Sequence, residues 1–316
     1  MNDILYIVMP VFNEEEIIKD SINVVTKKIR KLISSKKINK NSKLVIIDDG
    51  SIDNTLSIVL DIQKKNKYVI VVKLSRNYGH QIAMYAGYME SCKEADMVIS
   101  MDADLQDDIN VIDDMIDNYY NGNDIVYGVR NNRDTDSWFK RNSALLFYKL
   151  MNFFGVDIIN NHADYRLMSK KSLEELSKYQ ESNLFLRGII PMMGFSNSKV
   201  YYKRLERQGG KSKYNLKKMF GLAIDGITSF TIRPIRIIIN CGLFLSVISF
   251  IYLLYVIICK LSGAPNVNGW STLVVLISFF GSFQILCIGI IGEYISKIYI
   301  ETKHRPKYLI DKIIKR

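Results

Sequence analysis

Two long stretches without a charged side chain constrain this chain more than any other feature of its sequence. Residues 237–259 and residues 270–292 are each 23 residues long and contain no Asp, Glu, Lys or Arg. A helix of about 20 apolar residues crosses the ~30 Å hydrocarbon core of a bilayer. Two buried helices of a soluble core are the alternative, but core helices of this length normally keep a polar face. The residues between the stretches include Gly263, Pro265 and Gly269, which suit a turn between two antiparallel membrane spans.

The positive charge of the chain is concentrated around these apolar stretches. The formal net charge is +11, and from Lys211 onward there are 14 Lys and Arg against 4 Asp and Glu. The first 210 residues are nearly neutral, with 29 basic and 28 acidic residues, which argues against nucleic acid as a partner. The loop between the stretches carries only Lys260, whereas basic residues flank their outer ends: Arg233, Arg236, Lys297, Lys303, Arg305 and Lys307. The positive-inside rule therefore predicts a multi-pass membrane protein with both termini and the N-terminal domain in the cytoplasm.

The first 130 residues alternate between strand-like and helix-like patterns. This alternation predicts an α/β fold with a mostly parallel sheet and helices on both faces. Ligands of such sheets bind beyond the carboxyl ends of the strands. The predicted strands are 5–9, 44–47, 69–74, 97–101 and 124–127, and the predicted helices are 14–33, 54–65, about 81 onward, and 109–120. Neither GxGxxG nor GxxxxGK[ST] occurs in this region, which argues against a dinucleotide-binding fold and a P-loop.

Four polar loops follow the first four predicted strands. Their sequences are PVFNEE (10–15), DDGS (48–51), SRNYGH (75–80) and DADLQ (102–106). Because the strands are predicted to be parallel, we expect all four loops to meet at one edge of the sheet. Cys/His clusters and CxxC pairs are absent from the sequence, so a zinc site is not indicated.

The Asp102-Ala103-Asp104 sequence places two carboxylates side by side at the end of an apolar strand. A hard divalent cation such as Mg²⁺ or Mn²⁺ would remove their repulsion, because it prefers oxygen ligands from carboxylates and substrate phosphates. The alternative is an N-terminal capping cluster for the helix predicted from Ile109, since Asp is common in turns.

The second half of the chain contains further amphipathic and basic segments. An amphipathic helix is predicted over 137–154, a short strand after His162, an edge strand over 198–205, and a flexible basic loop over 207–214. Residues 216–230 form either a helix in the membrane interface or a soluble helix packed on the sheet, and their position before a span favours the interface. We therefore divide the chain into a catalytic domain (1–212), an interfacial amphipathic helix (213–232) and a two-span membrane region (233–316). The spans are expected at about 235–259 and 270–295, followed by a basic cytoplasmic tail.

The polar motifs occur in an order that resembles the family 2 glycosyltransferases. They are MPVFNEEE, IIDDGSIDNT, LSRNYGHQIA, MDADLQDD and HADYRLMS, spread over about 170 residues. The C-terminal sequences RQGGKSKYNLKKM and IGEYISKIYIETKHRPKY, with the two spans between them, resemble the polyprenyl-phosphate branch of this family. The QxxRW motif of processive polysaccharide synthases is absent. The resemblance covers nearly the whole chain and implies the GT-A fold.

The resemblance also implies roles for individual residues. The nucleotide site matches Pro10, Phe12, Glu14, Asp48, Arg76, Asn77, Gly79 and Asp102, and the metal and diphosphate site matches Asp102, Asp104 and Gln106. Asp164, with Asp104, occupies a catalytic position, as a base or as a group that orients the acceptor; the alternative is a salt bridge to Arg166. One of Asp48 and Asp49 is expected to serve only the turn before Gly50. His80 and His162 are expected to be hydrogen-bonded structural residues. The acceptor phosphate is expected to meet Arg130, Arg141, Arg207, Lys211 and Lys213.

The implied activity is inverting transfer of a sugar to undecaprenyl phosphate at the cytoplasmic leaflet of the bacterial inner membrane, with Mg²⁺ or Mn²⁺ as cofactor. The expected donor is UDP-glucose, with UDP-GlcNAc, UDP-galactose and GDP-mannose as alternatives. A non-catalytic membrane scaffold with a nucleotide-sensing domain is the alternative from another class, but the carboxylates and arginines that such a scaffold would lose are all present. The oligomeric state is open, with a homo-oligomer as one option.

Overall fold

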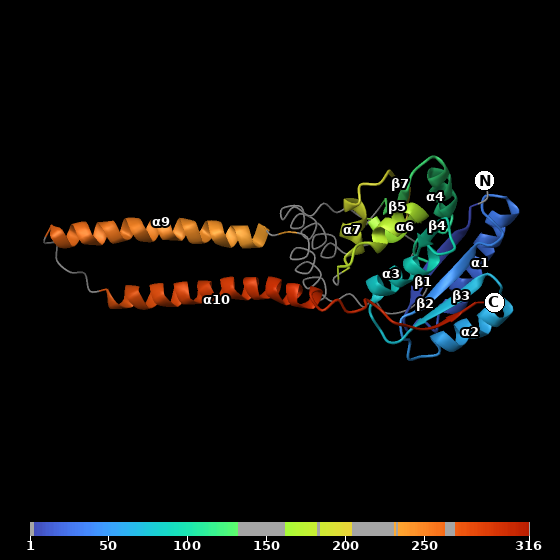
Figure 1. Cartoon of the computed structure of the whole chain (residues 1–316), viewed down its shortest axis with the longest axis horizontal. Coiled ribbons are helices and arrows are strands. Elements are labelled where there is room, and N and C mark those ends of the chain that lie inside the picture. The colour runs from blue at the N-terminus through green and yellow to red at the C-terminus, as the bar shows by residue number, and fades with distance from the viewer. Residues whose placement is uncertain are drawn as a thin grey trace.

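An eight-stranded sheet forms the centre of the protein in a computed structural model (Figure 1). The structure describes residues 3–131, 162–181, 184–203, 231, 233–262 and 269–315. The strand order is β7-β5-β6-β4-β1-β2-β3-β8. Four of the seven strand pairings among the described residues are parallel, which confirms the predicted mostly parallel α/β fold. The strands are β1 (Leu5–Val11), β2 (Lys43–Asp48), β3 (Val69–Leu74), β4 (Met97–Ser100), β5 (Ile125–Arg130), β6 (His162–Ser169), β7 (Asn197–Tyr202) and β8 (Ile310–Ile314).

Helices cover both faces of the sheet because both faces of its strands are apolar. In β1, for example, Ile7 packs with one cluster of buried side chains and Val8 with the other. Such double burial produces a continuous apolar run in place of a polar-apolar alternation. One face is covered by α1 (Ile18–Ser34), α2 (Thr55–Lys65) and α4 (Val111–Tyr120), and the other by α3 (His80–Ser91), α6 (Lys170–Ser177) and α7 (Leu186–Met192).

Helix α1 begins at Ile18, four residues later than the predicted start at Glu14. The preceding backbone is held by side chains of the neighbouring loop: Ser51 accepts from the N–H of Asn13 and Thr55 from the N–H of Glu14. Asn13 also has a positive φ of 55°, which a helix does not permit. These contacts keep 12–17 out of the helix and available at the sheet edge.

The strand directions place one end of seven strands along a single edge. Strands β1 to β4 run parallel, so the residues that follow them lie together. Strand β6 is antiparallel to β4 and β5, so its first residues meet the last residues of β4 and β5. Strand β7 is parallel to β5, with Tyr202 in register with Arg130. Strand β7 forms one edge of the sheet, as predicted.

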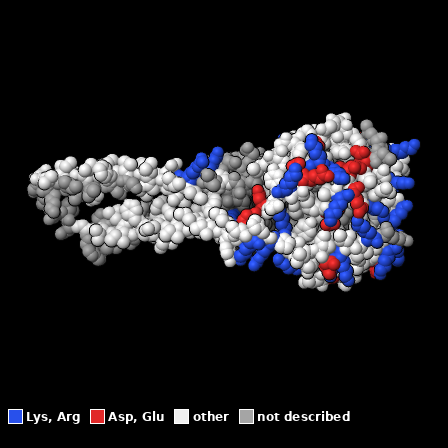
Figure 2. Space-filling view, viewed as in Figure 1, with Lys and Arg blue, Asp and Glu red and all other residues white. Residues whose placement is uncertain are grey.

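Two long apolar helices, α9 (Arg233–Leu261) and α10 (Trp270–Glu301), extend from the α/β unit as an antiparallel hairpin (Figure 1). Their most apolar windows are Arg233–Tyr252 (20 residues) and Phe279–Glu301 (23 residues), and neither window is buried inside the protein. The hairpin surface is almost free of charge, whereas Lys and Arg gather where it joins the α/β unit (Figure 2). These are two helices long and apolar enough to cross a membrane.

The end of the chain returns to the sheet, which the sequence did not predict. Residues 310–314, assigned above to a cytoplasmic tail, form β8 and pair antiparallel with β3. The backbone N–H of Ser75 donates to the carbonyl of Leu309 at 2.9 Å. Tyr308 packs edge-on against Tyr85 of α3, with 6.2 Å between ring centroids. The last residues are therefore part of the α/β unit, although they follow both apolar helices.

Candidate active site

The loops after β1 and β2 are joined by side-chain hydrogen bonds. Asn13 Oδ1 accepts from the N–H of Ile52 at 2.9 Å, in addition to the contacts of Asn13 and Glu14 described above. Of the predicted nucleotide contacts in the first loop, Pro10 lies inside β1 and is buried, whereas Phe12 and Glu14 lie beyond the strand and are half-buried. The two loops thus form one connected wall at the sheet edge.

Asp48 and Asp49 have different environments. Asp49 accepts the backbone N–H groups of Tyr78 (2.7 Å) and Gly79 (2.9 Å), and so fixes the third loop to the second. Asp48 is completely buried, and neither of its carboxylate oxygens has a hydrogen-bond partner of standard geometry among the described residues. Burial raises the pKa of Asp48 above its ordinary value. Ser51 partly opposes this rise in pKa. A carboxylate buried without a hydrogen bond of standard geometry is costly, and a ligand N–H would satisfy it.

The loop after β3 passes very close to the loop after β2. Gly50 has a φ of +70°, and a Cβ at this position would lie 2.7 Å from the backbone carbon of Arg76 and the nitrogen of Asn77. Only glycine permits both this conformation and this approach. Arg76 and Asn77, both predicted to line the nucleotide site, are exposed beside Gly79, and the Arg76 guanidinium stacks over the Tyr78 ring at 4.2 Å.

Asp102 and Asp104 follow β4 in an electronegative part of the site. Asp102 Oδ1 is buried and has no hydrogen-bond partner among the described residues. Burial raises the pKa of Asp102 to about 6, although His80 opposes the rise; Asp107, Asp164 and Asp104 raise it further. The backbone N–H of Gln106 donates to Asp104 Oδ1 at 3.3 Å, which closes a tight turn. The negative charges of several carboxylates therefore add up at Asp102, where they would stabilise a bound cation.

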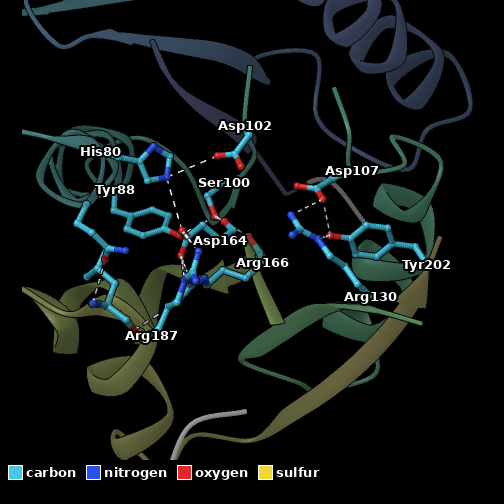
Figure 3. A network of polar contacts seen from close by, with 12 residues as sticks. His80, Tyr88, Ser100, Asp102, Asp107, Arg130, Asp164, Arg166, Arg187 and Tyr202 are labelled. Atoms are coloured by element: carbon cyan, nitrogen blue, oxygen red, sulfur yellow. Dashed lines mark hydrogen bonds and ion pairs between the residues drawn. The ribbon is translucent and has the colours of Figure 1, made fainter. Parts of the chain in front are cut away.

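Asp164 lies beside Asp102 and is held by two arginines (Figure 3). Its Oδ1 accepts from Arg166 Nη2 at 2.6 Å, and Arg187 donates from Nε to Oδ1 (3.1 Å) and from Nη2 to Oδ2 (2.7 Å). His80 Nε2 is 3.6 Å from Asp164 Oδ2 and 3.5 Å from Asp102 Oδ1. Burial alone would raise the pKa of Asp164, but Arg187, His80 and Arg166 hold it well below its usual range. Asp164 is therefore ionised at neutral pH.

The backbone of Asp164 is also fixed. Ser100, the last residue of β4, donates from Oγ to the carbonyl of Asp164 at 2.5 Å, and Tyr88 of α3 donates to Ser100 Oγ at 2.7 Å. The predicted alternative for Asp164, a salt bridge to Arg166, is present, but Arg187 and His80 share the carboxylate. His80 is within ion-pair distance of both Asp102 and Asp164, and it connects the two acidic positions.

Of the predicted acceptor-phosphate residues, Arg130 is at this edge and already has partners. It contacts Asp107 and Tyr202 (Figure 3). Arg141, Arg207, Lys211 and Lys213 lie outside the described residues, as do the predicted helices 137–154 and 216–230, so their roles stay predictions. His162 is the first residue of β6.

Sequence reasoning missed Arg187, Asp107 and Tyr202 as members of this site. Arg187 stands alone in the apolar segment LFLRGIIPMM, and Tyr202 ends an edge strand. The sequence around Arg187 and Tyr202 does not indicate a polar site, because their partners are distant in the sequence and come close only in the folded protein. Asp107 could have been predicted, because it directly follows the DADLQ motif and is acidic.

The residues present fit a divalent cation that is completed by substrate. Asp102 and Asp104 offer only oxygen ligands, and within the described part of the chain Asp102 Oδ1 makes no hydrogen bond, with His80 Nε2 3.5 Å away. Within the described part of the chain, no group of three or more His, Cys, Asp or Glu side chains could hold a metal ion alone. Mg²⁺ and Mn²⁺ are commonly bound through one or two carboxylates together with substrate phosphates, so this arrangement agrees with a cation shared with a diphosphate.

Two family models of sugar-transferring enzymes match the chain. Residues 6–177 match Glycosyl transferase family 2, and residues 233–298 match the GtrB C-terminal hairpin. The chain therefore belongs to glycosyl transferase family 2 and is a glycosyltransferase.

Similar proteins match the chain over almost its whole length. The uncharacterized glycosyltransferase YkoT of Bacillus subtilis (strain 168) is 49% identical over 308 residues, which are 98% of this chain and 91% of that protein. The bactoprenol glucosyl transferase of Shigella phage SfV is 41% identical, over 96% of this chain and 97% of that protein. Glucosyl-3-phosphoglycerate synthase from Mycobacterium tuberculosis, solved with Mn²⁺, UDP and phosphoglyceric acid, is 16% identical with a TM-score of 0.47, covering 72% of this chain and 76% of that one.

Proposed function

We propose that this glycosyltransferase moves glucose from UDP-glucose to undecaprenyl phosphate at the cytoplasmic leaflet, with inversion at the sugar carbon. The full-length similarity to a bactoprenol glucosyl transferase supports both the sugar and the lipid class. The apolar hairpin supports a bilayer-embedded acceptor, because moving a polyprenyl chain into water costs ~0.8 kcal/mol per CH₂ group. Both termini and the catalytic unit lie on the cytoplasmic side in this proposal.

The donor is bound by the connected loops after β1 to β4. Asp48 accepts the N–H of the uracil base, which satisfies a carboxylate that is buried without a partner of standard geometry. Arg76 and Asn77 lie along the nucleotide. Asp102 and Asp104, with Gln106, would hold a divalent cation that is shared with the diphosphate of the donor. When bound, the cation neutralises the charge that develops on the departing UDP.

The reaction forms a bond between an acceptor phosphate oxygen and C1 of glucose and breaks the bond between C1 and the β-phosphate oxygen of UDP. The second pKa of a phosphate monoester is about 6, so the acceptor is largely dianionic at neutral pH and needs no base. This agrees with Asp164, whose low pKa makes it a poor proton acceptor. Asp164 instead fixes the Arg187 guanidinium and His80 at the centre of the site.

The feature that supports the proposal most is that Asp102 Oδ1 makes no hydrogen bond among the described residues and lies 3.5 Å from His80 Nε2, which also contacts Asp164 at the sheet edge. The test incubates the purified full chain in proteoliposomes with undecaprenyl phosphate and Mg²⁺ or Mn²⁺. Radiolabelled UDP-glucose, UDP-GlcNAc, UDP-galactose and GDP-mannose are supplied separately. We expect label to enter the chloroform phase from UDP-glucose at least tenfold faster than from the others. Preference for another donor would correct the sugar, and no transfer from any donor would refute the proposal.

A further inference from the structure

Arg130, at the end of β5, belongs to a three-residue cluster drawn from three different elements (Figure 3). Its Nη2 is 3.1 Å from Asp107 Oδ1, and its Nε is 3.4 Å from the Tyr202 hydroxyl oxygen. Tyr202 in turn donates to the same Asp107 oxygen at 2.5 Å. The side chain of Asp107 is 3% exposed, whereas the Arg130 side chain is 24% exposed. The cluster is thus anchored inside the protein and open at the arginine.

The geometry restricts how Arg130 meets a ligand. A guanidinium has five N–H donors in a fixed plane, more than Asp107 and Tyr202 use. Burial alone would lower the pKa of Arg130, but Asp107 outweighs this effect and raises it, so Arg130 stays charged. Two contacts on one edge of the plane fix its rotation. An arginine oriented in this way is prepared for a phosphate, because less rotational freedom remains to be lost on binding.

Asp107 also belongs to the loop that carries Asp102 and Asp104. The intervening Leu105 has a positive φ of 50°. Beyond Asp107, the carbonyl of Asp108 accepts the Tyr165 hydroxyl at 3.1 Å, and the Tyr165 ring meets the Tyr202 ring edge-on with 5.6 Å between centroids. The loop that faces the donor diphosphate therefore ends in the carboxylate that orients Arg130.

We propose that Asp107 and Tyr202 are positioning residues for the acceptor: they hold Arg130 toward the lipid phosphate and tie its placement to the donor loop. This inference rests on the proposed function, because it takes a polyprenyl phosphate as the second substrate. Tyr202 and Asp107 do not contact the lipid themselves. They affect catalysis only by orienting Arg130. A positioning role can therefore be distinguished from a general contribution to stability, because it requires that Arg130 be present.

The test is a double-mutant cycle with Tyr202→Phe and Arg130→Ala in the full chain, measured with the donor that the wild type uses. Tyr202→Phe keeps the ring that packs on Tyr165 and removes only the hydroxyl. We expect it to raise the KM for undecaprenyl phosphate about tenfold, as for loss of a hydrogen bond to a charged group. The dissociation constant for the donor should stay within about twofold of wild type. In the Arg130→Ala background, Tyr202→Phe should have no further effect on the lipid KM.

The matched control is Tyr165→Phe in β6, which removes a hydroxyl that donates to the carbonyl of Asp108 in the same loop but does not contact Arg130. We expect its lipid KM to stay near that of the wild type. Asp107→Asn provides a second variant if Tyr202→Phe accumulates poorly. Additive effects of Tyr202→Phe and Arg130→Ala, an equal loss of donor affinity, or an equal effect of Tyr165→Phe would each overturn the inference. Absence of lipid transfer in the wild type would instead refute the proposed function, and the inference with it.

Discussion

Lys73 of β3 and Asp311 of β8 form an ion pair at 2.7 Å, although 238 positions separate them in the sequence. The chain passes through both apolar helices between these two residues. The pair is exposed and contributes little alone, but it marks a strand that covers the free edge of β3. Because Leu309 also accepts the N–H of Ser75, this strand supports the beginning of the loop that carries Arg76 and Asn77.

We therefore predict that a chain ending at Arg305 loses donor affinity while it keeps both apolar helices. Loss of the Ser75–Leu309 hydrogen bond, worth ~1 kcal/mol, corresponds to a dissociation constant about fivefold weaker. Isothermal titration with UDP-glucose measures this change, and the melting temperature should fall as well. Asp311→Asn in the full chain is the control and should behave as wild type. Unchanged donor affinity in the shortened chain would show that β8 has no influence on the nucleotide loop.

Asp104→Asn should lower turnover by roughly 10²–10³-fold, because electrostatic stabilisation of a departing anion is worth several kcal/mol. Manganese binding, followed by electron paramagnetic resonance in the presence of UDP, should weaken in parallel. Asp108→Asn is the matched control, since Asp108 lies in the same loop but its carboxylate accepts from the N–H of Asn110. Activity of Asp104→Asn within a few-fold of wild type would exclude this residue from the metal site.

Asp164→Asn should lower both stability and turnover, and added bases should not restore activity. The substitution leaves the guanidinium of the fully buried Arg166 without its carboxylate partner, and breaking a buried pair in this way costs about 3–5 kcal/mol. A lower melting temperature in detergent measures the first effect. The loss of turnover is tested by adding azide or formate, small anions that could replace a missing catalytic base. Rescue of turnover by either anion would show that Asp164 accepts a proton, contrary to the ionised, positioning role proposed here.

Glu94 links the last residues of the chain to β1, and its contribution should depend on pH. Its carboxylate accepts from Lys315 and, at 2.7 Å, from Tyr6, and these hydrogen bonds lower the pKa of Glu94 below its ordinary value of 4.5. A lowered pKa in the folded state means that the stabilisation is present above pH 4.5 and disappears as the pH falls through the folded-state pKa.

Glu94→Gln should thus be less stable than wild type at pH 7, by up to about 1 kcal/mol because the group is near the surface. The difference should shrink at pH values below 4.5. Denaturant unfolding of both proteins at a series of pH values gives the comparison. Glu175→Gln, which removes only an exposed pair with Lys178 on the surface of α6, is the control. The contacts assigned to Glu94 would be contradicted if the difference in the free energy of unfolding between wild type and Glu94→Gln were the same in acid as at pH 7.

The sequence predicts those features that are encoded locally. The sheet edge with Asp48, Asp102 and Asp104 follows from apolar strands that end in polar loops, and the two helices of the hairpin follow from their length and lack of charge. Helix α1 begins later than predicted because the backbone N–H groups of Asn13 and Glu14 are bound by Ser51, in the loop after β2, and by Thr55, at the start of α2.

Features that depend on distant partners escaped prediction. Strand β8 is only five residues long, and both apolar helices separate it from its partner β3 in the sequence. Neither a turn sequence nor an alternating pattern therefore predicts the pairing. Arg187 resembles a surface residue in an apolar segment until the fold places it on Asp164. Tyr202 is likewise the end of an edge strand in the sequence, and only the register with Arg130 gives it a partner.

The most direct test of the account measures glucose transfer by the purified full chain in proteoliposomes containing undecaprenyl phosphate, before and after EDTA and again after Mn²⁺ is restored. The account predicts that a glucosyl phosphate lipid, identified by mass spectrometry, forms only with a divalent cation, disappears with EDTA and returns with Mn²⁺. Full-rate formation of the lipid in excess EDTA would contradict the role assigned to Asp102 and Asp104.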